Sequence, residues 1–266
     1  MKKSVKVLLV LVCMIFIGVF AFSGYKLYTI MHDYKVSEKM YNGLSGQYVS
    51  ATGGTGSSGR KTTATGQTVN GESGEVETSP ISVDFETLLG ECEDVRGWIY
   101  SEGTVINYPV VKGEDNIFYL HRFIDGEYNP GGTPFIEYLC NGDFSGKNTV
   151  VYGHHMNDGS MFASLSEYRK EGYYDEHPVM YLNTPSQNYR VDVFAGYVTD
   201  ADSDTYTIGF QSEESYEEFL EKMQSQSDFK TSVKLSTEDK IITLSTCSYE
   251  FYDARYVIQG KLVPIN

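Results

Sequence analysis

Apolar positions form two different patterns along the chain, and the first is a continuous run from Val7 to Phe22 that follows Lys2, Lys3 and Lys6. At ~1.5 Å per helical residue the run spans ~24 Å, which suffices for a bilayer core of ~30 Å when flanking side chains reach the interface. The lysines place residues 1–6 in the cytoplasm. A signal peptide cleaved near residues 21–23 fits the same pattern. In either case we expect the rest of the chain to be exported.

Residues 24–79 carry no comparable apolar pattern. Residues 24–47 are polar and predict at most a loose juxtamembrane helix. Residues 51–79 are rich in Gly, Ser and Thr, and such a stretch buries too little apolar surface to order itself. We interpret 24–79 as a juxtamembrane segment and a flexible tether whose last ~30 residues reach roughly 30 Å. The tether is either a spacer that holds a domain off the membrane or a linker without further function.

From residue 80 onward, short alternating segments separated by turn residues are typical of strands. A helix is predicted from Ser82 to Leu89, with Ser82 or Asp84 as its cap, and amphipathic helices are predicted over 159–168 and 212–225. Strands and helices do not alternate, which argues against a doubly wound fold. We therefore predict a mainly β domain, a closed antiparallel barrel with appended helices, over residues 80–266. The predicted strands cover 97–100, 105–111, 133–138, 148–155, 189–199, 240–244 and 254–263.

Charge and cysteine content restrict the possible partners. The balance of 21 Lys and Arg against 36 Asp and Glu gives a net charge of −15, which argues against binding to nucleic acid. Cys13 lies in the apolar run, so no soluble disulfide framework is indicated. Cys92 and Cys140 are either a disulfide pair or two buried thiols. Side chains of the adjacent His154 and His155 point to opposite sides of a strand, and no acidic run has calcium-loop spacing. We predict no metal and no cofactor.

The candidate chemistry lies where two predicted strands meet. Cys247 ends the first strand, Arg255 begins the second, and residues 248–253 suit a hairpin turn that makes the two side chains face each other. A thiol is nucleophilic only as thiolate, and a neighbouring cation lowers its pKa. A guanidinium also stabilises the oxyanion that forms when sulfur attacks a carbonyl. The strand that ends in Gly153, His154 and His155 supplies a candidate acid or base.

The ordered set of Gly153-His154, Thr243-Leu244-Ser245-Thr246-Cys247 and Arg255, behind an apolar N-terminal segment, resembles the sortases, the cysteine transpeptidases of Gram-positive cell surfaces. The segments 94–99 and 108–111, and the long helix between the two strands that precede Cys247, are similar to class B. The resemblance covers roughly residues 80–266. It implies a closed, eight-stranded, antiparallel β-barrel with an N-terminal helix. It also favours an uncleaved membrane anchor over 7–23 and an extracellular catalytic domain.

The resemblance further implies roles for individual residues. Cys247 is expected to attack a peptide bond in the C-terminal sorting signal of a secreted protein and to form a thioacyl enzyme. His154, which matches the Gly-His of the family better than His155 does, is expected to act as general acid and then base. Arg255 is expected to bind the oxyanion or the substrate backbone. An amine of the peptidoglycan or its precursor is the expected acceptor.

Six further residues are predicted to bind substrate. Ser245 lies two positions before Cys247, so the strand period puts both side chains on one face. Asn116 and Leu120 match the family spacing for peptide contacts, although a helix cap and a core leucine explain them equally well. Residues 206–207 resemble the groove lining of the family. The predicted set is Ser245, Thr246, Tyr206, Thr207, Asn116 and Leu120.

Other functions remain open at this point. A pilin polymerase of the same class takes a lysine side chain as acceptor, and a tethered binding domain keeps the fold with an inactive site. A cell-wall cysteine L,D-transpeptidase requires a Ser/His-Gly-Cys motif, which the sequence lacks. Class B enzymes take sorting signals of either the Asn-Pro-x-Thr-Asn or the Pro-x-Thr-Gly type, and the sequence favours neither.

Overall fold

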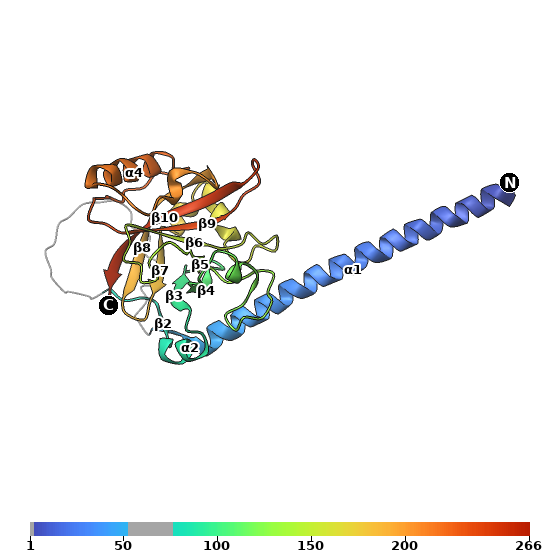
Figure 1. The fold of residues 1–266 in the computed structure, drawn as a ribbon, viewed down its shortest axis with the longest axis horizontal. Coiled ribbons are helices and arrows are strands. Elements are labelled where there is room, and N and C mark those ends of the chain that lie inside the picture. The colour runs from blue at the N-terminus through green and yellow to red at the C-terminus, as the bar shows by residue number, and fades with distance from the viewer. Residues whose placement is uncertain (1–2, 53–76) are drawn as a thin grey trace, which may run out of the picture.

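The computed structural model describes residues 3–52 and 77–266. It begins with α1, a single helix from Lys3 to Tyr48 that projects from the barrel (Figure 1). The expectation that residues 24–47 are at most loosely helical is therefore wrong. The reason is tertiary packing, because Tyr41, Leu44 and Tyr48 are buried against the domain. Packing of this kind stabilises helices more than intrinsic propensity does.

The N-terminal part of α1 behaves differently from its C-terminal part. From Leu11 onward its apolar side chains, such as Phe16 and Phe20, are exposed. By length and composition the helix is able to cross a membrane. One helix thus joins a segment with the properties of a membrane span to a segment that belongs to the domain.

A two-stranded sheet pairs the chain segment before residue 53 with the segment after residue 76. Strand β1 (Val49–Ala51) pairs antiparallel with β2 (Ile81–Val83), with Ser50 opposite Ser82. Residues 53–76, which hold most of the predicted flexible tether, lie outside the described residues. Because their two ends are held together by this sheet and α1 contacts the domain directly, their length does not set the distance between α1 and the barrel.

Eight strands form a closed barrel in the order β10-β8-β7-β3-β4-β5-β6-β9, which confirms the predicted eight-stranded closed barrel. The prediction that all strands are antiparallel is wrong, because β4 pairs parallel with β5, and β6 pairs parallel with β9. Residues 112–134 return the chain to the same end of the barrel between β4 and β5, as parallel pairing requires, whereas the chain between β6 and β9 includes β7, β8 and α4. The strands are β3 (Val95–Tyr100), β4 (Asn107–Val111), β5 (Phe135–Ile136), β6 (Asn148–Tyr152), β7 (Val179–Asn183), β8 (Asn188–Asp200), β9 (Ile241–Cys247) and β10 (Ala254–Ile265).

The helices agree with the sequence where a cap and an apolar face coincide. Asp84 caps α2 (Phe85–Glu91), and Ser212 caps α4 (Glu213–Ser225), which confirms a long helix between β8 and β9. The helix predicted over 159–168 is instead a 3₁₀ helix, η2 (Ala163–Arg169). The remaining helices are α3 (Tyr173–Glu176) and the 3₁₀ turns η1 (Phe118–His121) and η3 (Asp204–Tyr206). Cys92 and Cys140 are free, buried thiols and not a disulfide.

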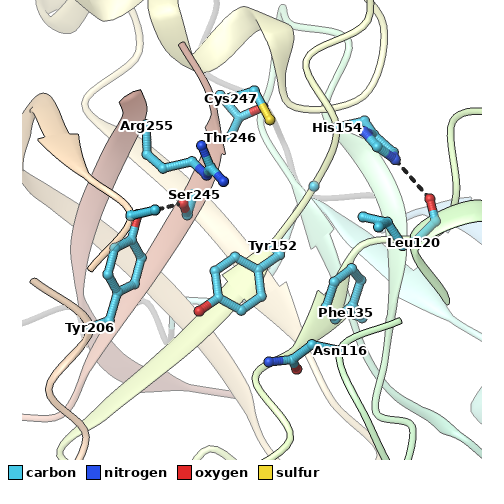
Figure 2. A pocket seen from close by; sticks show the side chains of 12 residues that line it. Asn116, Leu120, Phe135, Tyr152, His154, Tyr206, Ser245, Thr246, Cys247 and Arg255 are labelled. Atoms are coloured by element: carbon cyan, nitrogen blue, oxygen red, sulfur yellow. Dashed lines mark hydrogen bonds between the residues drawn. The ribbon is translucent and has the colours of Figure 1, made fainter. Parts of the chain in front are cut away.

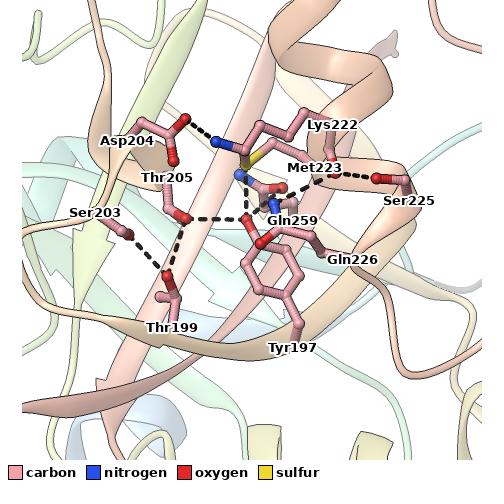
Figure 3. Close-up of polar contacts among 10 residues, drawn as sticks. All are labelled: Tyr197, Thr199, Ser203, Asp204, Thr205, Lys222, Met223, Ser225, Gln226 and Gln259. Atoms are coloured by element: carbon pink, nitrogen blue, oxygen red, sulfur yellow. Dashed lines mark hydrogen bonds and ion pairs between the residues drawn. The ribbon is translucent and has the colours of Figure 1, made fainter.

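A buried polar network fixes η3 against the barrel (Figure 3). The hydroxyl of Tyr197 on β8 lies 3.2 Å from Oγ1 of Thr205, and Oγ1 of Thr199 lies 3.3 Å from the same atom. Since buried hydroxyls lose free energy when they are left unpaired, these contacts favour a single position for η3. That position determines where Tyr206, the last residue of η3, points.

Candidate active site

The β9–β10 hairpin places Cys247 beside Arg255. The two residues are direct partners in the antiparallel ladder, as the hairpin in the sequence predicts. Residues 248–253 form the connection, with Asp253 in the left-handed region at a φ of 57°. The guanidinium of Arg255 donates one hydrogen bond to the carbonyl of Ala254 at 3.1 Å and points into the cavity described below (Figure 2).

Parallel pairing between β6 and β9 brings His154 to the same place. Tyr152 is the register partner of Ser245, and the amide of Gly153 donates to the Ser245 carbonyl at 3.0 Å. His154 therefore follows the end of β6 at the level of Cys247. Only glycine fits at position 153, because a Cβ there would lie 2.5 Å from the ring of Phe162.

A single cavity of about 270 Å³ collects these side chains (Figure 2). Eight of the nine predicted site residues line it: Asn116, Leu120, His154, Tyr206, Ser245, Thr246, Cys247 and Arg255. The ninth, Thr207, lies elsewhere: it lines a separate hollow beside α4, and its carbonyl accepts a hydrogen bond from Asn148 at 3.0 Å. In a loop, adjacent residues need not share a face, and of residues 206–207 only Tyr206 lines this cavity.

Four lining residues were not predicted: Phe135, Tyr152, Gly153 and Ala201. The strand predicted over 148–155 contained a signal for Tyr152, because it lies two positions before His154. In the structure that strand is shorter, and β6 ends at Tyr152. Phe135 gave no such signal, since its strand has only two residues. The predicted strand over 133–138 was too long.

The imidazole of His154 is held by a backbone carbonyl. Its Nε2 lies 2.7 Å from the Leu120 oxygen, and its ring stacks on His121 at 5.1 Å between centroids. Burial lowers the pKa of His154 below its usual value, the bond to Leu120 opposes that shift, and His121 adds to it. The ring is therefore neutral at pH 7 with its proton on Nε2, which leaves Nδ1 as the acceptor. The adjacent His155 lies outside the cavity lining and packs edge-on against Tyr249.

Comparison with known proteins identifies the family of the chain. The family model described as the sortase domain matches residues 102–263. A curated sortase B from Listeria monocytogenes is 34% identical over 252 residues, which are 94% of each chain. A crystal structure of sortase B from Bacillus anthracis, in complex with AAEK1, is 37% identical, with a TM-score of 0.63 over 68% of this chain and 84% of that one. A Staphylococcus aureus sortase B–substrate complex is 30% identical, with a TM-score of 0.65 over 68% and 85%.

The chain belongs to the class B sortases. It is therefore a cysteine transpeptidase that cleaves sorting signals. This family assignment favours neither a lysine-specific pilin polymerase nor an inactive binding domain.

The side of the sortase cavity opposite His154 is aromatic and polar. The hydroxyl of Tyr206 lies 2.9 Å from Oγ of the buried Ser245. Burial raises the pKa of Tyr206 to about 12, while the hydrogen bond with Ser245 and the positive charge of Arg255 oppose that shift. The phenol therefore remains protonated in the working pH range and pairs with Ser245 as a neutral donor or acceptor.

A carboxylate behind the cavity was also missed by sequence reasoning. Nδ2 of Asn116 donates to Glu137 at 2.6 Å, and Oδ1 of Asn116 accepts from the amide of Tyr138 at 3.0 Å. These bonds fix the orientation of the Asn116 amide. Burial and the charge of Glu137 raise the pKa of Tyr152. Nothing in the sequence around Glu137 distinguished it from a surface glutamate.

Proposed function

We propose that Cys247, His154 and Arg255 are the catalytic residues of this sortase. The observation that carries the proposal is that Cys247 and Arg255 are register partners while His154 lines the same cavity. Each residue type alone has many structural uses. Together, a nucleophile, a neutral base and a fixed cation are the parts that acyl transfer through sulfur needs.

Acylation begins with neutral His154, whose low pKa is caused mainly by burial. Nδ1 accepts the thiol proton as the sulfur of Cys247 attacks the carbonyl carbon of the scissile bond. The tetrahedral oxyanion lies near the guanidinium of Arg255, which stabilises the charge as it develops. Collapse breaks the carbon–nitrogen bond, and the imidazolium gives its proton to the leaving amine. The acyl group remains on sulfur as a thioester.

Deacylation reverses these roles. An incoming primary amine attacks the thioester carbon, His154 accepts a proton from the amine nitrogen, and that proton returns to the departing sulfur. The free thiol of Cys247 is restored and a new amide bond is formed. We propose a peptidoglycan amine as acceptor and a secreted protein with a C-terminal sorting signal as acyl donor. The need for no metal and no cofactor stays a prediction.

The same proposal includes a membrane topology for α1. Residues 7–23 cross the membrane once, the lysines before them remain in the cytoplasm, and the barrel lies outside. Support comes from the exposed apolar side chains along the helix after residue 10 and from its ability to span a bilayer by length and composition. An uncleaved chain of full mass in the membrane fraction is expected. A mature chain that begins after residue 23 would contradict the anchor.

The decisive experiment compares Cys247→Ala with the unaltered chain on peptides of the Asn-Pro-x-Thr-Asn and Pro-x-Thr-Gly types. We expect cleavage and a mass increase of the acyl fragment on Cys247 with the unaltered chain, and neither with Cys247→Ala. Cys13→Ala is the matched control and retains activity, because Cys13 lies on the exposed part of α1. If Cys247→Ala still cleaves, the nucleophile is assigned wrongly. The mass of the ligated product distinguishes a peptidoglycan amine from a lysine side chain.

A further inference from the structure

The Leu120 carbonyl, which lies beside Nε2 of His154, is in close contact with Gly132. Gly132 lies directly against it, because a Cβ at this position would be 2.3 Å from the Leu120 oxygen and 2.5 Å from the Tyr119 oxygen. Gly132 also has a φ of +55°, in the region that favours glycine. The next amide, of Thr133, donates to the Tyr119 carbonyl at 3.0 Å. The position of the 129–132 turn therefore determines the position of the Leu120 carbonyl.

This turn is held in place by α1. Oγ of Ser37 donates to Oδ1 of Asn129 at 2.6 Å, and the same Oδ1 accepts from the amide of Gly131 at 2.9 Å. One helical turn later, the hydroxyl of Tyr41 donates to the carbonyl of Gly132. Ser37, Asn129 and Tyr41 are all buried, so water does not replace either bond when a hydroxyl is removed.

Tyr41 also contacts the other side of the histidine segment. Its ring packs edge-on against Tyr108 at 5.1 Å between centroids, and the hydroxyl of Tyr108 accepts from the amide of Met161 at 3.0 Å. The amide of the next residue, Phe162, donates to the backbone carbonyl of His154 at 2.9 Å. Both the ring and the backbone of His154 are thus connected to Tyr41 through short paths of direct contacts.

We propose that Ser37 and Tyr41 are positioning residues, which hold the Leu120 carbonyl against the His154 ring so that the seating of α1 on the barrel sets the orientation of the imidazole. The inference rests on the proposed function for its effect on turnover, but not for its effect on the ring. The helix that carries the proposed anchor is then a part of the active-site support. When α1 is displaced from the barrel, His154 loses the bond that fixes its tautomer.

Small displacements suffice for a kinetic effect. A misplacement of about 1 Å can lower a rate by roughly 100-fold, whereas loss of one buried hydroxyl that touches neither substrate nor catalytic residue is expected to leave the domain folded. The proposal therefore predicts an effect on kcat without a matching effect on KM. A purely structural role of α1 would lower the melting temperature and leave the titration of His154 unchanged.

The experiment uses the full-length chain in detergent, labelled with ¹⁵N-histidine, and follows the imidazole resonances through a pH titration. The His154 resonances are assigned from their absence in His154→Gln. His121, which stacks on the ring, and Cys247 and Arg255 in the same cavity face His154 and are left unaltered. Because the bond to Leu120 raises the pKa of His154, its loss in Tyr41→Phe or Ser37→Ala should move the titration to lower pH. We expect kcat to fall roughly threefold to tenfold in either variant, with KM unchanged.

Tyr28→Phe is the matched control, because it removes a hydroxyl from an exposed position of the same helix. It should change neither the titration nor kcat. An unchanged His154 titration in both Ser37→Ala and Tyr41→Phe overturns the positioning role, whatever happens to the melting temperature. A shifted titration with unchanged kcat supports positioning but contradicts the catalytic role of His154. The two failures are therefore distinguishable.

Discussion

Cys247 and Arg255 are held together by the backbone ladder of one hairpin, whereas His154 is held by the carbonyl of a residue 34 positions earlier. The hairpin pairs the thiol and guanidinium residues through hydrogen bonds between adjacent strands, and these form whenever the hairpin forms. The imidazole depends on η1, on the turn at 129–132 and on α1. The difference indicates that one side of the proposed catalytic centre is set by local sequence and the other by distant packing. The histidine side is therefore the side on which substitutions far from the cavity should act.

The largest effect is expected at the imidazole itself. His154→Gln removes the proposed proton carrier and should lower kcat/KM for sorting-signal peptide cleavage by roughly 10²- to 10⁴-fold. His155→Gln is the neighbouring control and should retain near-normal activity, because its ring lies outside the cavity lining. Steady-state kinetics on both variants check the assignment. A greater loss in His155→Gln would reverse the roles of the two histidines.

On the hairpin side, Arg255→Lys tests whether charge alone is sufficient. A lysine keeps the positive charge but lacks the planar fork that serves two acceptors, so we expect kcat/KM to fall by roughly 100-fold. Arg190→Lys is the control, since Arg190 pairs with Asp192 outside the cavity lining. The rate of thioacyl formation, measured by rapid quench and mass spectrometry, gives the comparison. Normal acylation by Arg255→Lys would show that the bidentate geometry has no role.

A smaller effect is expected for the phenol that bonds to Ser245. Tyr206→Phe removes the hydroxyl at 2.9 Å from the Ser245 oxygen and leaves the ring in place. One such hydrogen bond contributes about 1 kcal/mol, so kcat/KM should fall roughly fivefold. Tyr252→Phe, in the exposed β9–β10 connection, is the matched control and should behave like the unaltered chain. A loss above roughly 100-fold in Tyr206→Phe would indicate that the hydroxyl acts directly on the reacting atoms.

The smallest effect concerns stability. Because the pKa of His154 is lowered in the folded state, the unfolded chain takes up the proton first as the pH falls. The stabilising contribution of His154 is complete above the unfolded pKa of about 6.5 and is lost as the pH falls from there through the folded pKa. Melting temperatures measured between pH 7.5 and 5 should therefore decrease more steeply in the unaltered chain than in His154→Gln. Equal slopes would contradict a neutral, buried imidazole.

Much of the fold and of the candidate site could be predicted from local sequence. The apolar run, the cap at Asp84, the strand that leads into His154 and the hairpin from Cys247 to Arg255 are patterns of neighbouring residues, and the structure keeps each of them. The strand period identified Ser245 as a lining residue for the same reason. Such features depend on contacts between residues close in the chain, which the sequence displays directly.

Only the tertiary structure decided how these pieces meet. The parallel pairs β4–β5 and β6–β9, the continuation of α1 to Tyr48 and the separation of Thr207 from Tyr206 all depend on contacts between distant residues. The same holds for Glu137 behind Asn116 and for Gly132 beneath Leu120. A residue pattern specifies which face of an element is apolar. Which other element packs against that face is determined by the free energy of closing the barrel. The orientation of His154 is therefore a property of the closed barrel and the helix seated on it.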